Sequence, residues 1–229
     1  MCGRTTRPAA VLFDLYETLI QARSGSSFYH SVPTALGADP ERWLVAYRAL
    51  GRAAMTGAVP DLTTRVHLAC REAGQPCRPA RVAAVVDEHL ASFYAGIRLD
   101  PHALATLTTL RAAGLRLAVV SNAARPSERV LDTLGLRAAT DAVVMSYSLG
   151  VLKPDPRIYH TALAAVGVTP AEAVFVGDGG DGELGGAKRL GIRTVLVDRG
   201  LPHTEAARAD ADFRCPDLSG VAPLLLAGA

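Results

Sequence analysis

The sequence predicts an α/β protein, with a doubly wound parallel sheet as its core and a helical domain inserted near the N-terminus. From residue 100 onward, short apolar runs alternate with helix-like patterns, as in repeated strand–helix–strand units. The runs are apolar almost throughout, which is typical of parallel strands buried on both faces. Residues 21–96 show helical patterns without a convincing strand. We therefore expect a core domain of residues 1–20 and 97–229 and a helical cap domain of residues 21–96.

The first strand is predicted within VLFDLYETLI, residues 11–20. Its apolar run stops at Asp14, and Tyr16 and Thr18 follow directly. A carboxylate on a rigid strand can act as a nucleophile through a covalent aspartyl intermediate. An aspartate in this position can equally cap a helix or form a turn, so the local pattern leaves both roles open.

The inserted segment carries three helix patterns, at residues 40–57, 61–74 and 79–95. A helical insertion after the first strand would cover the crevice at the carboxyl ends of the strands. Contacts between domains of one chain are usually modest, so we expect the cap to move relative to the core. Substrate identity would depend on the cap residues that face the crevice, and the candidates are Tyr29, His30, Arg48, Arg52 and His67.

The later strands are short and apolar. They are LRLAVVSN (115–122), DAVVMS (141–146), AVFVGD (173–178), RTVLVD (193–198) and ADFRC (211–215). The helices between them begin with proline or end at glycine, the expected start and stop signals. They are PHALATLTTLRAAG, PSERVLDTLG, PRIYHTALAAVG and ELGGAKRLG.

Three polar residues stand at the carboxyl ends of separate predicted strands: Asp14, Ser121 and Asp178. In a doubly wound sheet, these ends meet at one crevice. Ser121 and Asn122 offer a hydroxyl group and nearby backbone N–H groups to a phosphoryl or carboxylate oxygen. The same two residue types also favour a plain strand-to-helix turn. We include Thr18 with them among the candidate substrate-binding residues.

Four motifs occur in order along the core: FDLYETL at 13–19, VVSN at 119–122, GVLKPDPRIY at 150–159 and VFVGDGGDGELGGA at 174–187. Together they resemble the haloacid dehalogenase (HAD) superfamily, in the group with a helical cap inserted after the first strand. The resemblance covers nearly the whole core and implies a hydrolase with Asp14 as the nucleophile. Lys153 would keep Asp14 ionised and offset charge on the transferred group.

The acid-rich and glycine-rich segment GDGGDGE, residues 177–183, suits Mg²⁺, which takes oxygen ligands and keeps several waters. By resemblance, Asp178 would ligate the metal beside Asp14 and the backbone carbonyl of Tyr16. Glu183 stands where the family has a further acidic residue, and Asp181 competes for that role. A glycine-rich turn whose acids cap the next helix is the plain alternative.

Tyr16 departs from the resemblance, because phosphatases of the family usually carry a second Asp there. That residue acts as a general acid and base, which is worth about 10²–10⁴ in rate. Tyrosine has a reference pKa near ~10 and is a poor base at neutral pH. Glu17 is the nearest carboxylate that could replace it, although neighbouring strand-end side chains tend to point apart.

Three functions remain open. The first is a Mg²⁺-dependent phosphohydrolase that acts on a small phosphorylated metabolite. It would need a good leaving group, or a proton donor from the cap, from a substrate group or from water. The second is a metal-independent 2-haloacid dehalogenase, a group that also carries Tyr here and whose halide leaves without a proton. The third is a HAD-like protein that binds its ligand with little or no turnover. Asp178 favours the phosphohydrolase, because without a metal it would repel a substrate carboxylate.

The amino-acid composition limits the kinds of partner that we expect the protein to bind. The 229 residues are 49% apolar and carry a net charge of +2, with interleaved basic and acidic residues. We expect no nucleic-acid partner, since that needs a clustered basic face. The longest apolar runs are too short to cross a bilayer, and no stretch of signal-peptide type precedes Asp14. We therefore expect a cytoplasmic protein, monomeric or homodimeric, with Cys2, Cys70, Cys77 and Cys215 as reduced thiols.

Overall fold

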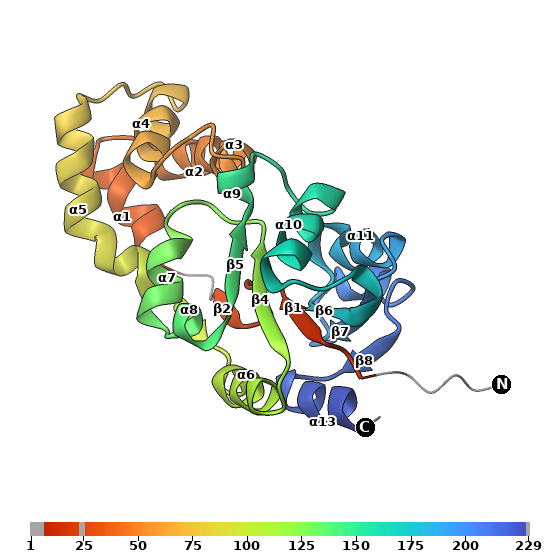
Figure 1. The fold of residues 1–229 in the computed structure, drawn as a ribbon. Coiled ribbons are helices and arrows are strands. Elements are labelled where there is room, and N and C mark those ends of the chain that lie inside the picture. Colours follow the sequence, from red (N-terminus) through yellow and green to blue (C-terminus); the bar gives the residue numbers. More distant parts are fainter. Residues whose placement is uncertain (1–6, 23–25, 228–229) are drawn as a thin grey trace.

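The computed structural model describes residues 7–22 and 26–227, and a six-stranded parallel sheet lies at its centre (Figure 1). The strand order is β5-β4-β1-β6-β7-β8. The strands are β1 (Ala10–Phe13), β4 (Arg116–Ser121), β5 (Ala142–Met145), β6 (Ala173–Gly177), β7 (Arg193–Val197) and β8 (Phe213–Cys215). Every strand that the sequence predicts is present, although each of the five later strands is one or two residues shorter than the predicted run.

Both faces of the sheet are covered by helices, as β1 illustrates. Val11 and Phe13 belong to one apolar core, and Ala10 and Leu12 belong to the other, as expected where successive side chains point to opposite faces. The first face is covered by α6 (Ala103–Ala112), α7 (Ser127–Thr133), α8 (Leu136–Ala139) and α13 (Val221–Leu226). The second face is covered by α10 (Pro156–Val166) and α11 (Glu183–Arg189). The predicted doubly wound α/β core is therefore confirmed.

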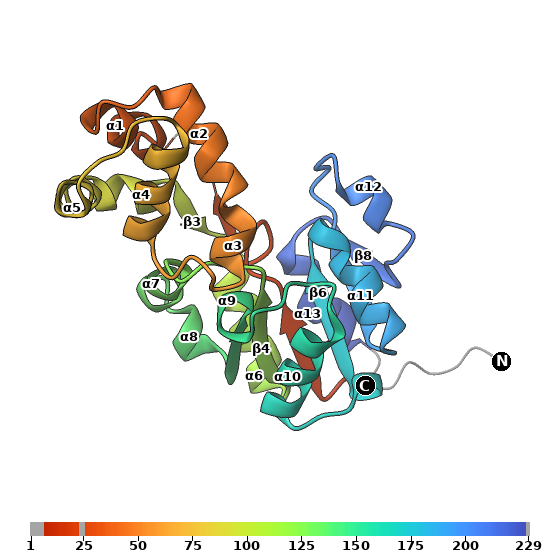
Figure 2. The same cartoon turned by 90° about the horizontal axis from the view of Figure 1, so that it is seen from above.

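Short elements complete the core. They are α9 (Ser146–Leu149), α12 (Thr204–Ala207) and the 3₁₀ turns η1 (Pro170–Glu172), η2 (Gly180–Gly182) and η3 (Leu218–Gly220). The first of them, α9, follows β5 directly and faces the inserted helices, while η2 and α12 flank the carboxyl ends of β6 and β7 (Figure 2).

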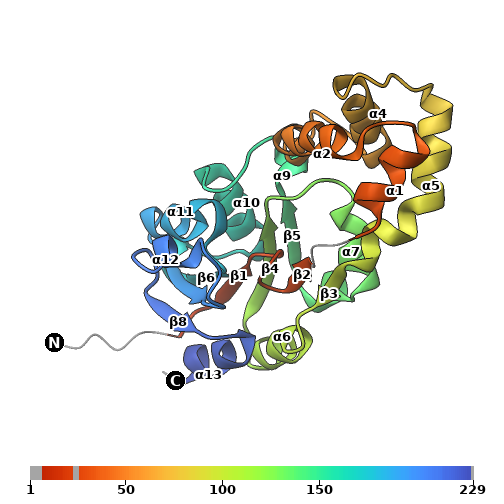
Figure 3. The same cartoon turned by 180° about the vertical axis from the view of Figure 1, so that it is seen from behind.

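The predicted helical insertion is also confirmed, and it stands to one side of the sheet beyond the carboxyl ends of its strands (Figures 2 and 3). It comprises α1 (Phe28–Ala35), α2 (Pro40–Ala49), α3 (Gly51–Met55), α4 (Leu62–Glu72) and α5 (Pro79–Ala95). Its buried apolar side chains form a cluster of their own around Phe28, Trp43, Val66 and Val86. We propose on this ground that residues 21–96 form the cap domain and that residues 1–20 and 97–229 form the core domain.

Three local predictions for the insertion are wrong. Helix α1 was not expected, because Pro33 lies inside it and proline normally disfavours a helix interior. The pattern at 40–57 is two helices, α2 and α3, rather than one. Two short strands, β2 (Ile20–Ala22) and β3 (Ile97–Leu99), pair antiparallel where the chain enters and leaves the cap.

Some expectations fall on residues that are not described, including the thiol of Cys2 and the ends of the proposed core domain. Cys70, Cys77 and Cys215 are free thiols. Within residues 7–22 and 26–227, no helix combines the length and the apolar character that a membrane crossing requires.

Candidate active site

Three neighbouring strands bring the predicted polar residues together. β1 lies between β4 and β6, so Asp14, Ser121 and Asp178 follow or close adjacent strands at the same edge of the sheet. The backbone N–H of Asp14 donates to the Val176 carbonyl (2.9 Å), which extends the β1–β6 pairing to the nucleophile position. Asp14, Ser121 and Asp178 are all buried. The three residues thus meet at the carboxyl ends of three adjacent inner strands of the sheet.

Lys153 connects two buried carboxylates. It lies on the loop between α9 and α10, and its ammonium group pairs with Oδ1 of Asp14 and with Oε2 of Glu183. All three side chains are at least 93% buried. A buried charge is tolerated only where it is paired, so the two carboxylates hold Lys153 in the crevice instead of at the surface.

The buried group contains more negative than positive charge. One carboxylate oxygen each of Asp14, Asp178 and Glu183 lies within 4.8 Å of the others, and Lys153 is shared between two of them. Burial raises the pKa of Asp14 despite the nearby ammonium, and Asp178 adds to this effect. Burial, with repulsion from the other two carboxylates, raises the pKa of Glu183 to about 8. A divalent cation would offset the excess of negative charge in this buried group. The carboxylate oxygens are donors of the kind that Mg²⁺ prefers.

Asp178 is held by two donors from its surroundings. Its Oδ1 accepts from the Gly180 backbone N–H (3.0 Å), and its Oδ2 accepts from Nε2 of His203 (2.7 Å). His203 lies on the loop between β7 and α12, and its role was missed from the sequence. A lone histidine 25 residues downstream carries no motif. Only the adjacency of β6 and β7 could have directed attention to that loop.

Glu183 and Asp181 differ sharply in position. Glu183 is buried and its Oε1 accepts from the Gly179 backbone N–H (3.1 Å). Its close approach requires glycine at position 177, because a Cβ atom there would collide with Oε1. Asp181 is exposed, and its carboxylate accepts from the Asn122 side chain (2.8 Å). Glu183 therefore joins the acidic cluster and Asp181 does not.

Asn122 braces the loop that carries Lys153. Its Oδ1 accepts from the Lys153 backbone N–H (2.7 Å), and its Nδ2 donates to the Lys153 carbonyl (3.1 Å) as well as to Asp181. Both N–H groups of the amide are used by these contacts. In the structure the side chain of Asn122 positions the Lys153 loop, and its binding of substrate stays a prediction.

Two buried hydroxyl groups at the same edge have no hydrogen-bond partner within the described chain. These are Oγ of Ser121 and Oγ1 of Thr18, and both residues are at most 1% exposed. Buried polar atoms nearly always find a partner. Their lack of one, beside Asp14, is what a site for an oxygen-rich ligand would show.

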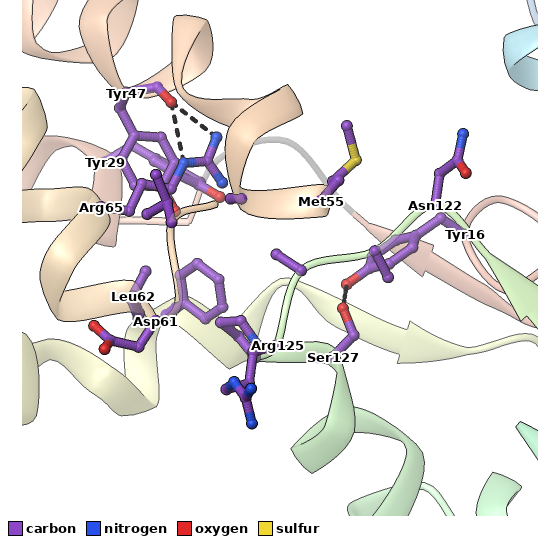
Figure 4. A pocket seen from close by; sticks show the side chains of 16 residues that line it. Tyr16, Tyr29, Tyr47, Met55, Asp61, Leu62, Arg65, Asn122, Arg125 and Ser127 are labelled. Carbon is purple, nitrogen blue, oxygen red and sulfur yellow. Dashed lines mark hydrogen bonds between the residues drawn. The ribbon is translucent and has the colours of Figure 1, made fainter. Parts of the chain in front are cut away.

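No carboxylate of residue 16 or 17 lies next to Asp14, because Tyr16 has none and the carboxylate of Glu17 contacts the Ala22 backbone instead. A hydrogen bond of 2.9 Å joins the Tyr16 hydroxyl to Oγ of Ser127 on α7 (Figure 4), and burial raises the pKa of Tyr16 further above its ordinary value. Glu17 adopts a positive φ of 58°, and its carboxylate accepts from the Ala22 backbone N–H (3.1 Å). The expected stand-in for the missing acid is therefore turned toward β2.

A pocket of about 290 Å³ opens beside Tyr16, between the inserted helices and the loop after β4 (Figure 4). Of the five cap residues predicted to select the substrate, Tyr29 lines this pocket. His30 and Arg48 line a larger cavity of about 640 Å³ in the cap instead. Arg52 and His67 are not among the described residues that line either space.

Comparison with known proteins shows the family of this chain. The model of the haloacid dehalogenase-like hydrolase family matches residues 8–191. The chain belongs to this family. The membership that the four motifs predicted is confirmed.

Relatives in the family include both phosphatases and dehalogenases. Phosphoserine phosphatase of Thermus thermophilus is 41% identical over 54% of this chain and 49% of its own. Glyceraldehyde 3-phosphate phosphatase of Methanopyrus kandleri is 37% identical over 63% of each chain. (S)-2-haloacid dehalogenase 4A of Burkholderia cepacia is 33% identical over 60% of each chain. The alignments thus cover less than two thirds of each relative.

A solved structure of similar fold is the HAD phosphatase from Thermococcus onnurineus. It aligns with a TM-score of 0.68 over 95% of this chain and 97% of its own, at 22% sequence identity. At this identity the likeness shows the fold alone.

Proposed function

We propose that the protein is a Mg²⁺-dependent phosphohydrolase that forms an aspartyl-phosphate on Asp14 and acts on a small phosphorylated metabolite. The observation that carries the proposal is the buried carboxylate of Asp178 beside Asp14 and Glu183, of which Lys153 pairs with the latter two. The phosphatases among the relatives support the same reaction class.

Mg²⁺ fits the donor set, with Asp14 and Asp178 as side-chain ligands and the Tyr16 carbonyl as a predicted third. When bound there, the ion would offset charge on a phosphoryl group. Glu183 already accepts from Lys153 and from a backbone N–H. We therefore assign it chiefly to holding Lys153, rather than to direct ligation.

The reaction itself follows from the positions of the remaining groups. Ser121 and Thr18 donate from their unpaired hydroxyls to the phosphoryl oxygens, and Lys153 orients Asp14 through its Oδ1. A carboxylate oxygen of Asp14 forms a bond to phosphorus, and the bond from phosphorus to the leaving oxygen breaks with its electron pair on that oxygen. Water then attacks phosphorus and loses a proton to solvent, and the bond between phosphorus and the Asp14 oxygen breaks with its electron pair on that oxygen, which releases inorganic phosphate and restores the aspartate.

The test is phosphate release from acetyl phosphate with Mg²⁺ and with a chelator. We expect turnover that the chelator abolishes and that Asp14→Asn lowers by at least about 10³-fold, because the nucleophile is lost. Asp87→Asn, an exposed aspartate on α5, is the matched control and should retain full activity. Phosphate release that survives Asp14→Asn would refute the proposal.

A second candidate is a 2-haloacid dehalogenase, which Tyr16 favours because halide departs without a proton. The dehalogenase relative supports it. Chloride release from 2-chloropropionate that ignores the chelator would select this function over the first. Release of neither phosphate nor halide, together with retained binding of a phosphate analogue, would favour a HAD-like binding protein.

A further inference from the structure

We propose that the pocket beside Tyr16 binds the leaving group of the substrate, and that this group is an uncharged aromatic ring. The substrate class is then the aryl phosphate monoesters. The inference rests on the proposed function, which it extends from a reaction to a kind of substrate.

The pocket adjoins the catalytic group through residues that serve both. Tyr16 lies two positions after Asp14 and lines the pocket, and Asn122, which braces the Lys153 loop, lines it as well. On the ground of these two shared residues, we place the leaving group of a phosphoryl ester bound at Asp14 in this space. The pocket's volume of about 290 Å³ is small, at the lower end of small-molecule sites.

Aromatic side chains form much of the wall. Tyr16, Tyr29, Tyr47 and Phe93 line the pocket together with Met55, Val59 and Leu62. The rings of Tyr29 and Tyr47 meet edge to face at 5.7 Å, and those of Tyr29 and Phe93 lie 6.5 Å apart. Aromatic walls at such spacings favour a flat ring, which can stack on them or meet them edge to face.

The charged residues of the lining are engaged elsewhere. Arg65 lies over the Tyr47 ring at 3.8 Å and donates from Nε and Nη2 to the Tyr47 carbonyl (Figure 4). Asp61 caps α4 by accepting from the Thr64 backbone N–H (2.7 Å). Arg125 donates from Nε to the Pro60 carbonyl (3.1 Å). The two arginines keep their charge, but a charged leaving group would have to compete with these existing contacts, which is costly.

The chemistry at Tyr16 points to the same class. Position 16, where the family's phosphatases carry the proton donor, holds a tyrosine, and Glu183 is bound to Lys153, so the leaving oxygen departs without a proton from a dedicated acid. A phenolate carries that charge far better than an alkoxide does, because the ring delocalises it. The aromatic lining of the pocket and the tyrosine at position 16 are separate observations. Both favour an aryl leaving group over the leaving group of an amino-acid or sugar phosphate.

The experiment compares phenyl phosphate with 4-carboxyphenyl phosphate, which has the same ring with one added charge. We expect the enzyme to prefer phenyl phosphate by about tenfold in kcat/KM. Met55→Lys, at a half-buried lining position, should reverse this preference by supplying a cation. Val45→Ala, on the exposed face of α2, is the control and should keep the preference of the natural protein.

Acetyl phosphate separates the two levels of the proposal, because it has a good leaving group and no ring. Acetyl phosphate turnover with equal use of the two aryl substrates, and no effect of Met55→Lys, overturns the assignment of this pocket to an uncharged aromatic leaving group and leaves the phosphohydrolase intact. No phosphate release from acetyl phosphate or from either aryl substrate overturns the proposed function itself.

Discussion

Loss of the Lys153 side chain should lower the free energy of unfolding. It pairs with Asp14 and Glu183, and its pKa is raised by these carboxylates in spite of burial. Removing one partner of a buried pair typically costs about 3–5 kcal/mol. We expect Lys153→Ala to lose this much in the free energy of unfolding, measured by urea denaturation with a chelator present.

The chain's only other lysine provides the control for that measurement. Lys188 pairs with Asp212 at 2.9 Å, and its side chain is 42% exposed. Such surface pairs contribute about 0–1 kcal/mol. Equal destabilisation by Lys153→Ala and Lys188→Ala would show that the buried ion pairs do not hold the site together.

Tyr16 is expected to affect the rate of hydrolysis rather than the stability of the fold. Restoring a carboxyl group with Tyr16→Asp should speed the hydrolysis of alkyl phosphates by about 10²-fold or more. The gain should be smaller for 4-nitrophenyl phosphate, whose leaving group needs no proton. Tyr16→Phe serves as the control, since it removes the hydroxyl bonded to Ser127 without adding an acid. A gain that is equal for both substrate types would contradict the account of Tyr16.

At the scale of the element, the loop between β7 and α12 supports the site from outside. His203 on this loop donates to Asp178, and outer partners of metal ligands commonly contribute 10-fold or more to affinity. Mg²⁺ binding should raise the Tm of the protein. We expect that His203→Ala needs about ten times more Mg²⁺ to reach half of this increase in Tm. His160→Ala, at an exposed position of α10, should leave that concentration unchanged, and an equal effect in both variants would refute the role of His203.

The cap contacts the core at the junction between α3–α4 and α9. Ser146 donates to the Met55 carbonyl (2.7 Å), and Gly57 approaches Tyr147 so closely that a Cβ atom would strike its carbonyl. Gly57 has a φ of +79° and Gly74 has a φ of +81°, but nothing lies within 4 Å of the Cβ position at Gly74. The two glycines are therefore a matched pair.

We expect Gly74→Ala to cost about 1–2 kcal/mol, the usual cost of a side chain in the left-handed region. Gly57→Ala should cost more and should also lower kcat/KM, because the added methyl group forces the cap away from α9. Thermal unfolding and steady-state kinetics of both variants test this. Similar losses in the two variants would show that the junction does not set the position of the cap.

At the scale of the whole molecule, the sequence predicted the features that follow from hydrophobic periodicity and from the convergence of strand ends. The five later strands, the helices between them and the meeting of Asp14, Ser121 and Asp178 follow from apolar runs and from the geometry of parallel sheets. Helix α1 escaped prediction because tertiary packing around Phe28 overrides the proline inside it. These are limits of local patterns, which do not record packing.

The partners of the site residues were harder to predict than the residues themselves. His203 and Ser127 meet Asp178 and Tyr16 only through the fold, since 25 and 111 positions separate the members of each pair. The exposed position of Asp181 depends on its backbone turn, where φ is 54°. Composition and motif spacing carry none of this information.

The central claim is that Asp14 becomes phosphorylated in each catalytic cycle. The most direct measurement is mass spectrometry of the enzyme after rapid acid quenching during turnover of acetyl phosphate with Mg²⁺. We predict one added phosphoryl group on the peptide that contains Asp14, and none in the Asp14→Asn variant. Steady phosphate release with no phosphoryl group on Asp14, or with the group on another residue, would contradict it.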